Sequence, residues 1–513
     1  MMKRVFSFKL LHNCSLTTQA RKPHLLRILF VTSEAYPLVK TGGLADVSGS
    51  LPKALSALGQ DVRILIPGYP SVIHKLVNLH HVANLEGLPI IANAELLAGN
   101  MPDSGVQVLV INSPSLYQRE GGPYVAPDGK DWEDNPLRFG ILSKVAAILS
   151  SSDSPIKNWI PEIVHCNDWQ SGLTPAYMHY MRAYRTDIHH AKSVISIHNL
   201  AFQGCFSPEW VAHLGLPQSS YSMHGLEYYG QISFLKAGVF YADMLCTVSE
   251  TYAKEIQTPA FGFGMQGLLA SRAHEIKGIL NGIDTEEWNP AADPHLSASF
   301  DAKKLVGKQA VKQSLQKQLG LEKDPKIPLL GVVSRLTHQK GLDMLLDEAE
   351  PVLRLGCQIA LLGSGEAQLE SGFKLLEKLY PKQVSINIGY NEPLSHQIMA
   401  GADIFIMPSR FEPCGLNQMY GLRYGTPSIV TNTGGLADSI TNTDEVSLKN
   451  NTATGFIMTE STPEALKASL EYALKCYANS PLWHRIQRNG MRKDLSWEKS
   501  AQAYMGVYQQ LLA

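Results

Sequence analysis

Short apolar segments alternate with helical segments along almost the whole chain, and this alternation restricts the fold more than any other feature. The first apolar segment spans residues 25–32, a helix is predicted over 44–58, and a second apolar segment follows at 62–67. Further strands of this first series are expected at residues 106–111, 163–166 and 193–197. Strands that alternate with helices predict parallel sheets with right-handed crossovers.

A second series of the same kind follows a more polar and irregular stretch at residues 281–326. Its strands are expected at residues 328–333, 358–362, 384–388, 404–407 and 428–430. We therefore expect an α/β protein with two Rossmann-like, doubly wound domains that face each other across a cleft. The predicted parts are a disordered extension at 1–23, an N-terminal domain at 24–275, a C-terminal domain at 276–494 and a final segment at 495–513.

The composition excludes several classes of protein. The 513 residues are 44% apolar and only 18% charged, so the chain can bury a large core. Its 45 Lys and Arg residues against 46 Asp and Glu residues leave a net charge of −1, which favours no nucleic-acid partner. No apolar run reaches the roughly 18 residues of a spanning helix, so no membrane partner is expected. The seven cysteines are scattered without C-x-x-C spacing, which is typical of a reducing compartment.

The first 33 residues contain six Lys or Arg residues and no acidic residue. An acid-poor leader is typical of organellar transit peptides, so a plastid location is one alternative. The leader lacks the long apolar stretch of a secretory signal. We favour a short disordered extension on a cytoplasmic protein.

The hexapeptide Thr-Gly-Gly-Leu-Ala-Asp occurs twice, at residues 41–46 and 433–438. Each copy follows a predicted strand and opens a predicted helix, where backbone amides and the helix dipole favour anions. The alternative is that two tight turns use the same glycines for the same geometry. We expect a ligand bound from both domains, with Lys40 adding a positive charge to the first turn. The candidate binding residues are Lys40, Gly42, Gly43, Asp46, Thr433, Gly434 and Gly435.

Two loops of the second series carry further charged candidates. Arg335 and Lys340 follow strand 328–333, and two fixed cations there suit a diphosphate leaving group without a metal. Glu412 follows strand 404–407, and Pro413 after it suits a helix start. Glu412 is therefore either a helix cap or a carboxylate that binds sugar hydroxyls. In the second case, phosphate is expected to meet the backbone amides of Cys414, Gly415 and Leu416.

In the first series, polar residues follow two neighbouring strands. Asp168 and Trp169 come after strand 163–166, and His198 and Asn199 come after strand 193–197. A carboxylate that accepts from hydroxyls, beside an aromatic ring that stacks on a sugar face, predicts sugar binding. No H-E-x-x-H motif, Cys/His cluster or P-loop occurs, and no G-x-G-x-x-G follows the first strand, so we expect no metal and no cofactor.

Taken together and in this order, the motifs resemble those of bacterial glycogen synthases and plastid starch synthases. The resemblance is carried by residues 40–44, 165–170, 198–204, 281–284, 334–341, 412–418 and 433–436. These families are glycosyltransferases that extend α-1,4-glucan from ADP-glucose. The resemblance, which runs from about residue 25 to the C-terminus, implies two Rossmann-like domains of the GT-B type. It also implies a final helix at 495–512 that crosses back onto the N-terminal domain.

The resemblance implies a role for each matching residue. Lys40 would bind the nucleotide sugar, Arg335 and Lys340 the diphosphate, and Glu412 would be the essential carboxylate. Catalytic positions near the reacting sugar would be Asp168 and His198, and Asn281 would bind substrate. The implied partners are ADP-glucose as donor and glycogen or a malto-oligosaccharide as acceptor.

The implied reaction retains the configuration at the anomeric carbon. A double displacement through a carboxylate nucleophile is one route. We favour same-face attack, in which the departing phosphate oxygen takes the proton of the acceptor. Three rivals are a transferase of this architecture with another donor or acceptor, a catalytically silent glucan-binding protein, and an NAD oxidoreductase. The missing glycine fingerprint opposes the last of these.

Overall fold

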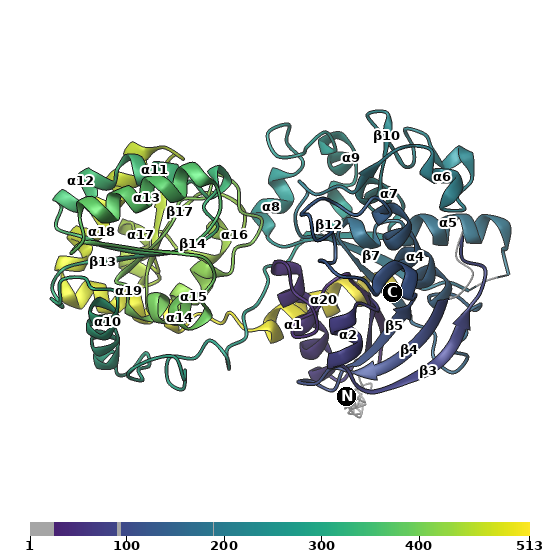
Figure 1. The fold of residues 1–513 in the computed structure, drawn as a ribbon, viewed down its shortest axis with the longest axis horizontal. Coiled ribbons are helices and arrows are strands. Elements are labelled where there is room, and N and C mark those ends of the chain that lie inside the picture. The colour runs from purple at the N-terminus through teal and green to yellow at the C-terminus, as the bar shows by residue number, and fades with distance from the viewer. Residues whose placement is uncertain (1–24, 90–93, 188) are drawn as a thin grey trace, which may run out of the picture.

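The computed structural model describes residues 25–89, 94–187 and 189–513. The extension predicted at 1–23 lies outside the described residues. The chain forms two α/β lobes, each built on one large sheet with helices on its faces (Figure 1). No helix in the described part of the chain is long and apolar enough to span a bilayer.

The first lobe contains a nine-stranded sheet in the order β12-β11-β7-β6-β1-β2-β5-β4-β3. Its parallel strands are β1 (Arg27–Val31), β2 (Asp61–Pro67), β5 (Gln107–Asn112), β6 (Ile163–Asn167), β7 (Lys192–Ile197), β11 (Met244–Thr247) and β12 (Ile276–Gly278). At one edge, β3 (Val77–Leu85) and β4 (Ala94–Asn100) pair antiparallel. The expectation of a purely parallel sheet was therefore wrong at this edge. β3 is mostly solvent-exposed, so it lacks the apolar run by which the buried strands were recognised.

The helices of the first lobe cover both faces of this sheet. They are α1 (Gly43–Ala57), α2 (Pro70–Lys75), α3 (Pro114–Tyr117), α4 (Asn135–Leu149), α5 (Thr174–Tyr184), α6 (Trp210–His213), α7 (Phe234–Tyr241), α8 (Glu250–Glu255) and α9 (Gln266–Ser271). A small antiparallel sheet joins β8 (Cys205–Phe206), β10 (Gln231–Ser233) and β9 (Glu227–Tyr228).

The second lobe contains a six-stranded parallel sheet in the order β15-β14-β13-β16-β17-β18. Its strands are β13 (Leu329–Val333), β14 (Gln358–Gly363), β15 (Val384–Ile388), β16 (Ile404–Met407), β17 (Ser428–Thr431) and β18 (Phe456–Met458). All five strands predicted for the second series are present, and β18 extends the sheet at its edge.

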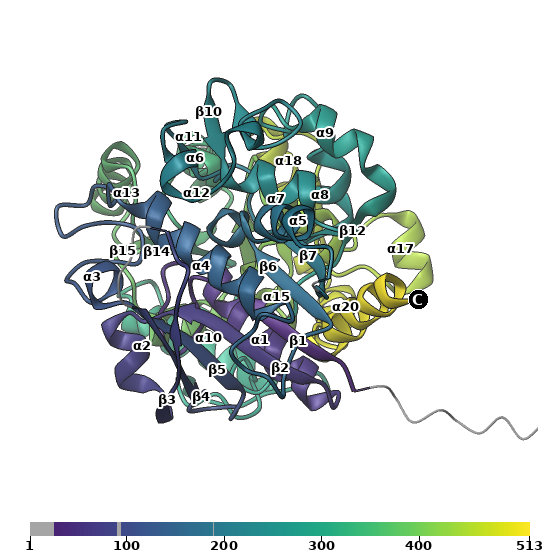
Figure 2. The same cartoon turned by 90° about the vertical axis from the view of Figure 1, so that its right-hand side faces the viewer.

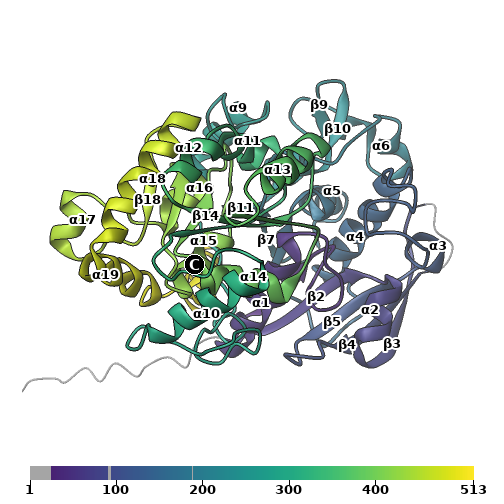
Figure 3. The same ribbon diagram turned by 60° about the vertical axis from the view of Figure 1, so that its left-hand side comes forward.

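The helices of the second lobe also lie on both faces of their sheet. They are α10 (Val306–Gln318), α11 (Leu342–Asp347), α12 (Ala349–Arg354), α13 (Ala367–Leu379), α14 (Glu392–Gly401), α15 (Asn417–Arg423), α16 (Gly434–Ser439), α17 (Glu445–Asn450), α18 (Pro463–Ala478) and α19 (Ser480–Met491). Leu315 of α10 shares a buried apolar cluster with Leu394 and Ile398 of α14, and the two helices lie side by side in Figure 3.

The last helix, α20 (Trp497–Leu512), belongs to the core of the first lobe. Tyr504 and Tyr508 are fully buried in one cluster with Ile28 of β1 and Leu51 of α1. Figure 2 shows α20 beside α1 and β1, far along the chain from both. The helix predicted at 495–512 is confirmed, and it packs onto the first sheet. The domain boundaries after residues 275 and 494 stay predictions.

The strand orders explain where a ligand site can form. β1 lies between β2 and β6, and β13 lies between β14 and β16, so the chain winds in opposite directions from each of these strands. Open α/β sheets bind ligands in the crevice at such switch points, beyond the carboxyl ends of the strands. The turn with Lys40 follows β1, and the loop with Arg335 follows β13.

Candidate active site

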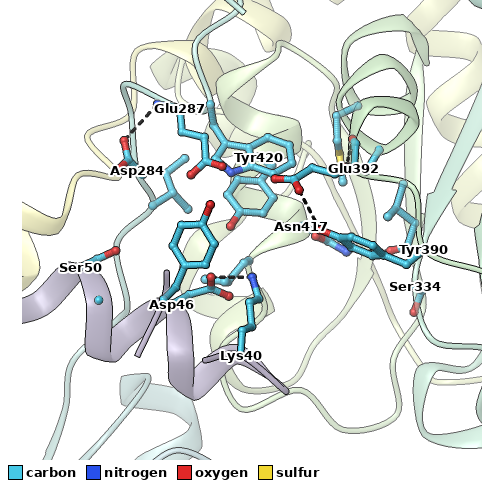
Figure 4. A pocket seen from close by; sticks show the side chains of 18 of the residues that line it. Lys40, Asp46, Ser50, Asp284, Glu287, Ser334, Tyr390, Glu392, Asn417 and Tyr420 are labelled. Carbon is cyan, nitrogen blue, oxygen red and sulfur yellow. Dashed lines mark hydrogen bonds and ion pairs between the residues drawn. The ribbon is translucent and has the colours of Figure 1, made fainter. Parts of the chain in front are cut away.

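A cavity of about 400 Å³ lies between the two lobes. Lys40, Asp46 and Tyr36 line it from the first lobe, while Arg335 and Tyr420 line it from the second. Figure 4 shows Lys40 and Asp46 on one wall and Tyr420 with Glu392 on the other. The turns of the two switch points therefore meet in one cavity.

The first glycine turn presents an open helix N-terminus. Gly42 is the residue before α1, and a β-carbon at either Gly42 or Gly43 would meet no atom within 4 Å. The Lys40 ammonium lies 2.6 Å from Asp46 Oδ1, so Asp46 orients the lysine rather than standing apart from it. Burial raises the pKa of Asp46, while Lys40 opposes that shift. This turn has the space and charge to bind an anion.

Glu34 holds this turn in place, and the sequence motifs did not point to it. Its carboxylate accepts hydrogen bonds from the backbone amides of Thr41 at 2.5 Å and Gly42 at 3.2 Å. Tyr124 donates its hydroxyl to the other carboxylate oxygen at 2.5 Å. In the sequence, only the position of Glu34, three residues after the end of β1, indicated that it could lie near the site.

The second glycine turn is closed. Gly434 donates its amide to Glu255 Oε1 at 3.0 Å, and the Gly435 amide donates to the Pro413 carbonyl at 3.0 Å. Thr433 also donates its hydroxyl to Glu255 Oε1. These groups were expected to bind phosphate, but protein groups occupy them. Here the turn joins α8 of the first lobe to the loop of Glu412, and α8 and α16 face each other in Figure 1.

This difference between the two copies predicts that the same substitution destabilises one turn and leaves the other nearly unchanged. Gly434 has φ +41°, and a β-carbon there would lie 2.0 Å from the Glu412 carbonyl oxygen. We expect Gly434→Ala to lower the free energy of unfolding by about 2 kcal/mol or more, because the Glu412 loop must move. Gly42→Ala is the matched control, and its free energy of unfolding should stay within about 0.5 kcal/mol of the wild-type value. Equal melting temperatures for the two variants would contradict the closed second turn.

Glu412 is buried beside the basic loop. Lys340 donates to Glu412 Oε2 in an ion pair, and Ser409 Oγ donates to the same oxygen at 3.2 Å. The Arg410 guanidinium fastens this loop by two hydrogen bonds, of 2.7 and 2.6 Å, to the Asp343 carboxylate. The helix expected to start at Pro413 begins only at residue 417, so the interpretation of Glu412 as a helix cap was wrong.

The three predicted cations have different surroundings. Arg335 is exposed and lines the cavity. Lys340 is paired with Glu412, and Lys40 with Asp46. Lys40 and Arg335 thus line the first cavity together, as expected for two cations that bind one ligand. Lys340, the third predicted cation, does not line this cavity.

Asp168, which is buried, and His198, which is half-buried, form one polar cluster at the end of β6. The His198 backbone amide donates to Asp168 Oδ1 at 2.7 Å, and His198 Nε2 lies 3.0 Å from Asn167 Oδ1. Asp168 has φ +52° and ψ −168°, a backbone conformation outside the left-handed helical region that residues other than glycine rarely adopt. Burial raises the pKa of Asp168 to about 7 and lowers that of His198 to about 4, so the imidazole is neutral at pH 7.

The raised pKa of Asp168 predicts a pH-dependent stability. Its ordinary value is 3.8, so between about pH 4 and pH 7 the folded chain binds more proton than the unfolded chain. The stability that the neutral carboxyl contributes is therefore lost as pH rises through this window. Asp168→Asn keeps the Oδ1 acceptor and should gain about 3 kcal/mol relative to wild type between pH 5 and pH 8. Thermal melts at both values test this, and a pH-independent difference would contradict it.

Trp169 is packed in the first lobe rather than open to a sugar on both faces. Its ring contacts Phe139 and Phe206, with ring centroids 4.9 and 5.8 Å apart. A β-carbon at Gly204 would lie 2.4 Å from the indole, so this glycine allows the close approach. Part of Trp169 still lines a second cavity of about 650 Å³, together with Gln203.

The remaining predicted residues lie around these groups. Asn281 is buried, and its Oδ1 has no partner among the described residues. Cys414 is buried, which raises the pKa of its thiol to about 12. Leu416 lines the first cavity, and Gly415 has φ +71° beside Gln418. The Asn199 side chain accepts from the Ala201 amide, a local turn.

His165, at the start of one shared motif, has a structural position. Its Nδ1 lies 2.7 Å from the Tyr508 hydroxyl, and its Nε2 lies 2.7 Å from Ser196 Oγ. Burial lowers its pKa to about 3. The hydrogen bonds of His165 therefore link α20 to β7, and His165 does not line the first cavity.

Two facing α/β lobes with a charged cavity between their switch points define a glycosyltransferase of the two-domain GT-B type. Residues 27–271 match the family described as the starch synthase catalytic domain, and residues 311–493 match glycosyl transferases group 1. The chain belongs to the family of glycogen and starch synthases.

Individual relatives agree with this assignment. A glycogen synthase of Nitrosospira multiformis is 51% identical over 493 residues, which cover 96% of this chain and 98% of the relative. A glycogen synthase of Nitrosomonas eutropha is 50% identical, covering 95% and 96%. Both come from bacteria, and nothing in them supports the plastid alternative.

Solved structures show the same relationship. The catalytic domain of starch synthase IV from Arabidopsis thaliana, bound to ADP and acarbose, is 31% identical with a TM-score of 0.84. The match covers 95% of this chain and 100% of the starch synthase chain. Sucrose-phosphate synthase from Thermosynechococcus elongatus is 15% identical, with a TM-score of 0.56 and coverage of 95% and 99%, and shares the fold alone.

Proposed function

We propose that this chain transfers glucose from ADP-glucose to the nonreducing 4-hydroxyl of an α-1,4-glucan such as glycogen, with retention at the anomeric carbon. One observation carries the proposal: Lys40 and Arg335, from the two switch points, line one cavity between the lobes. The 51% identity to a glycogen synthase, and the ADP bound to the related starch synthase IV, favour ADP-glucose over UDP-glucose. We place the reaction in the cytoplasm.

The cations would act on the leaving group. Negative charge develops on the diphosphate as the glycosidic bond breaks, and fixed positive charges stabilise it without further reorganisation. Lys40 is already oriented by Asp46, and the start of α1 at Gly43, which has open space beside it, adds a helix N-terminus. These groups belong to the first lobe, while Arg335 belongs to the second. Full stabilisation would therefore need both lobes around the donor.

Same-face attack remains the preferred route to retention. A double displacement needs a carboxylate that is free to attack the sugar. Glu412 is instead engaged by Lys340 and Ser409, which suits a group that binds hydroxyls. The departing phosphate oxygen would take the proton of the acceptor hydroxyl. We propose that the acceptor approaches through the second cavity, beside Trp169 and Gln203.

Lys40→Gln should raise KM for ADP-glucose by at least tenfold and leave the KM for glycogen near its wild-type value. The lysine is half-exposed and its partner Asp46 lies on the same wall of the cavity. The substitution therefore removes a contact to the nucleotide sugar rather than a packing contact within the protein. Initial rates with each substrate varied in turn test the assignment. A change in the glycogen constant alone would show that Lys40 serves the acceptor.

The decisive assay incubates the purified chain with glycogen and either ADP-glucose or UDP-glucose, and follows nucleotide release and glucan growth. We expect ADP release with glucan elongation. Growth only with UDP-glucose would favour the related transferase of another donor. Glucan binding without release from either donor would favour a silent glucan-binding protein.

A further inference from the structure

Three potential metal ligands gather at the edge of the first cavity. Glu287, Glu392 and His396 each offer one ligand atom, and these atoms lie within 4.8 Å of one another. Glu287 follows β12 in the segment between the lobes, whereas Glu392 and His396 lie on α14. Figure 4 shows the carboxylates of Glu287 and Glu392 facing each other beside Tyr420.

His396 supplies the observation that separates this cluster from an ordinary acidic surface. Its side chain is only 2% exposed, and its Nδ1 lies 2.7 Å from Asp293 Oδ2. That contact leaves Nε2, which is buried and has no hydrogen-bond partner among the described residues. A buried imidazole nitrogen without a partner is costly unless a ligand satisfies it.

The surroundings of His396 match those of a metal-binding histidine. Such histidines commonly donate the second ring nitrogen to a carboxylate, which fixes the tautomer and the ring orientation. Asp293 is that carboxylate here, and Tyr424 donates to it as well, at 2.5 Å. Trp288 stacks on the imidazole with a centroid distance of 3.8 Å and on Tyr420 at 3.7 Å, so the ring is held rigidly.

The charges also favour a cation. The ligand oxygens of Glu287 and Glu392 lie within 4.8 Å of one another, so two like charges repel one another at this site. Neither carboxylate has a salt bridge to a lysine or arginine within the described ranges. The Tyr390 hydroxyl, 3.2 Å from Glu392 Oε2, is a neutral partner. A divalent ion between the two carboxylates would remove the repulsion.

We propose that Glu287, Glu392 and His396 form a binding site for one zinc-type divalent cation, which fastens the segment after β12 to α14. Two carboxylate oxygens and one imidazole nitrogen suit Zn²⁺, with a fourth position left for water. Ligands about 2.1 Å from one ion lie about 3 to 4 Å apart, so a rotamer change of the exposed Glu287 closes the remaining gap. The ion takes no part in the transfer proposed above.

The test uses the full chain after removal of metals with EDTA and dialysis. Titration with Co²⁺, followed by its visible absorption, and with Zn²⁺, followed by calorimetry, should reveal one equivalent that binds saturably. Glu392→Gln and Glu287→Gln should each lower the affinity for this ion by about 100-fold or more. Zn²⁺ should raise the melting temperature of the wild-type chain but not of Glu392→Gln. Mg²⁺, which prefers six oxygen ligands, should not compete.

Glu286→Gln is the matched control, because it removes the same charge one residue earlier from an exposed side chain. It should keep the saturable equivalent. An equal loss in Glu286→Gln would reduce the effect to surface charge and overturn the proposal. Unchanged binding by Glu392→Gln, or no saturable binding below millimolar Zn²⁺, would overturn it too. Melting without metal shows whether each variant folds.

Discussion

Replacing Glu412 by alanine is expected to lower kcat by two or more orders of magnitude while the protein stays folded. The carboxylate is buried, and its hydrogen-bond and ion-pair partners among the described residues are Lys340 and Ser409. Its loss therefore removes a contact to the reacting sugar rather than apolar packing, and kcat should fall together with kcat/KM. Steady-state rates and thermal melts of the purified variant measure both effects.

A control separates this role from positioning of the loop. Asp343→Asn weakens the paired hydrogen bonds from Arg410 that hold the same loop, but it leaves the Glu412 carboxylate in place. We expect this variant to melt earlier and to lose at most a few-fold in kcat. If Glu412→Ala kept near-native kcat and a normal melting temperature, Glu412 would only anchor the loop.

Arg335→Ala is expected to lower kcat/KM by roughly 100-fold, a loss of about 3 kcal/mol in transition-state stabilisation. The guanidinium is exposed in the cavity, and it makes no side-chain hydrogen bond or ion pair within the part of the chain that the structure describes. The melting temperature should therefore stay unchanged, since no protein contact is lost. An equal fall in stability and rate would show that Arg335 supports the fold instead.

The same variant tests how the leaving diphosphate is stabilised. Fixed cations would supply the positive charge, so wild-type turnover should survive millimolar EDTA, and added Mg²⁺ should not rescue Arg335→Ala. A complete loss of wild-type activity in EDTA, reversed by Mg²⁺, would contradict this. It would indicate a metal that acts in the transfer, held either by Glu287, Glu392 and His396 or by a carboxylate site to be sought first at residues 131–134.

Local sequence predicted most of the fold because buried parallel strands appear in the sequence as short runs of apolar residues. The first strand was expected at 25–32 and forms at Arg27–Val31, and every predicted strand of the second sheet is present. The antiparallel edge strands β3 and β4 were not predicted, because β3 is mostly exposed and the buried residues of β4 are interrupted by more exposed ones, so neither forms a continuous apolar run. The switch points followed only from the strand order, which depends on pairing between distant segments.

The candidate site was predictable only in part. Lys40 and Arg335 could be placed at strand ends from the sequence, and the structure brings them to one cavity. Glu34 and Glu255 could not be found, since each acts through backbone amides of a turn with no charge pattern to reveal it. His165 stood in a shared motif, yet its partner Tyr508 lies 343 residues further along the chain.

The repeated hexapeptide separates what the sequence determined from what the tertiary structure decided. Its glycines and its place after a strand determined a turn and a helix start in both copies, because these depend on local backbone freedom. In the first copy, Gly42 and Gly43 face open space beside Lys40. In the second, Gly434 lies against the Glu412 carbonyl and binds Glu255 from the other lobe. Gly42 and Gly434 both donate their amides to a glutamate, but packing between distant segments leaves space beside the first turn and none beside the second.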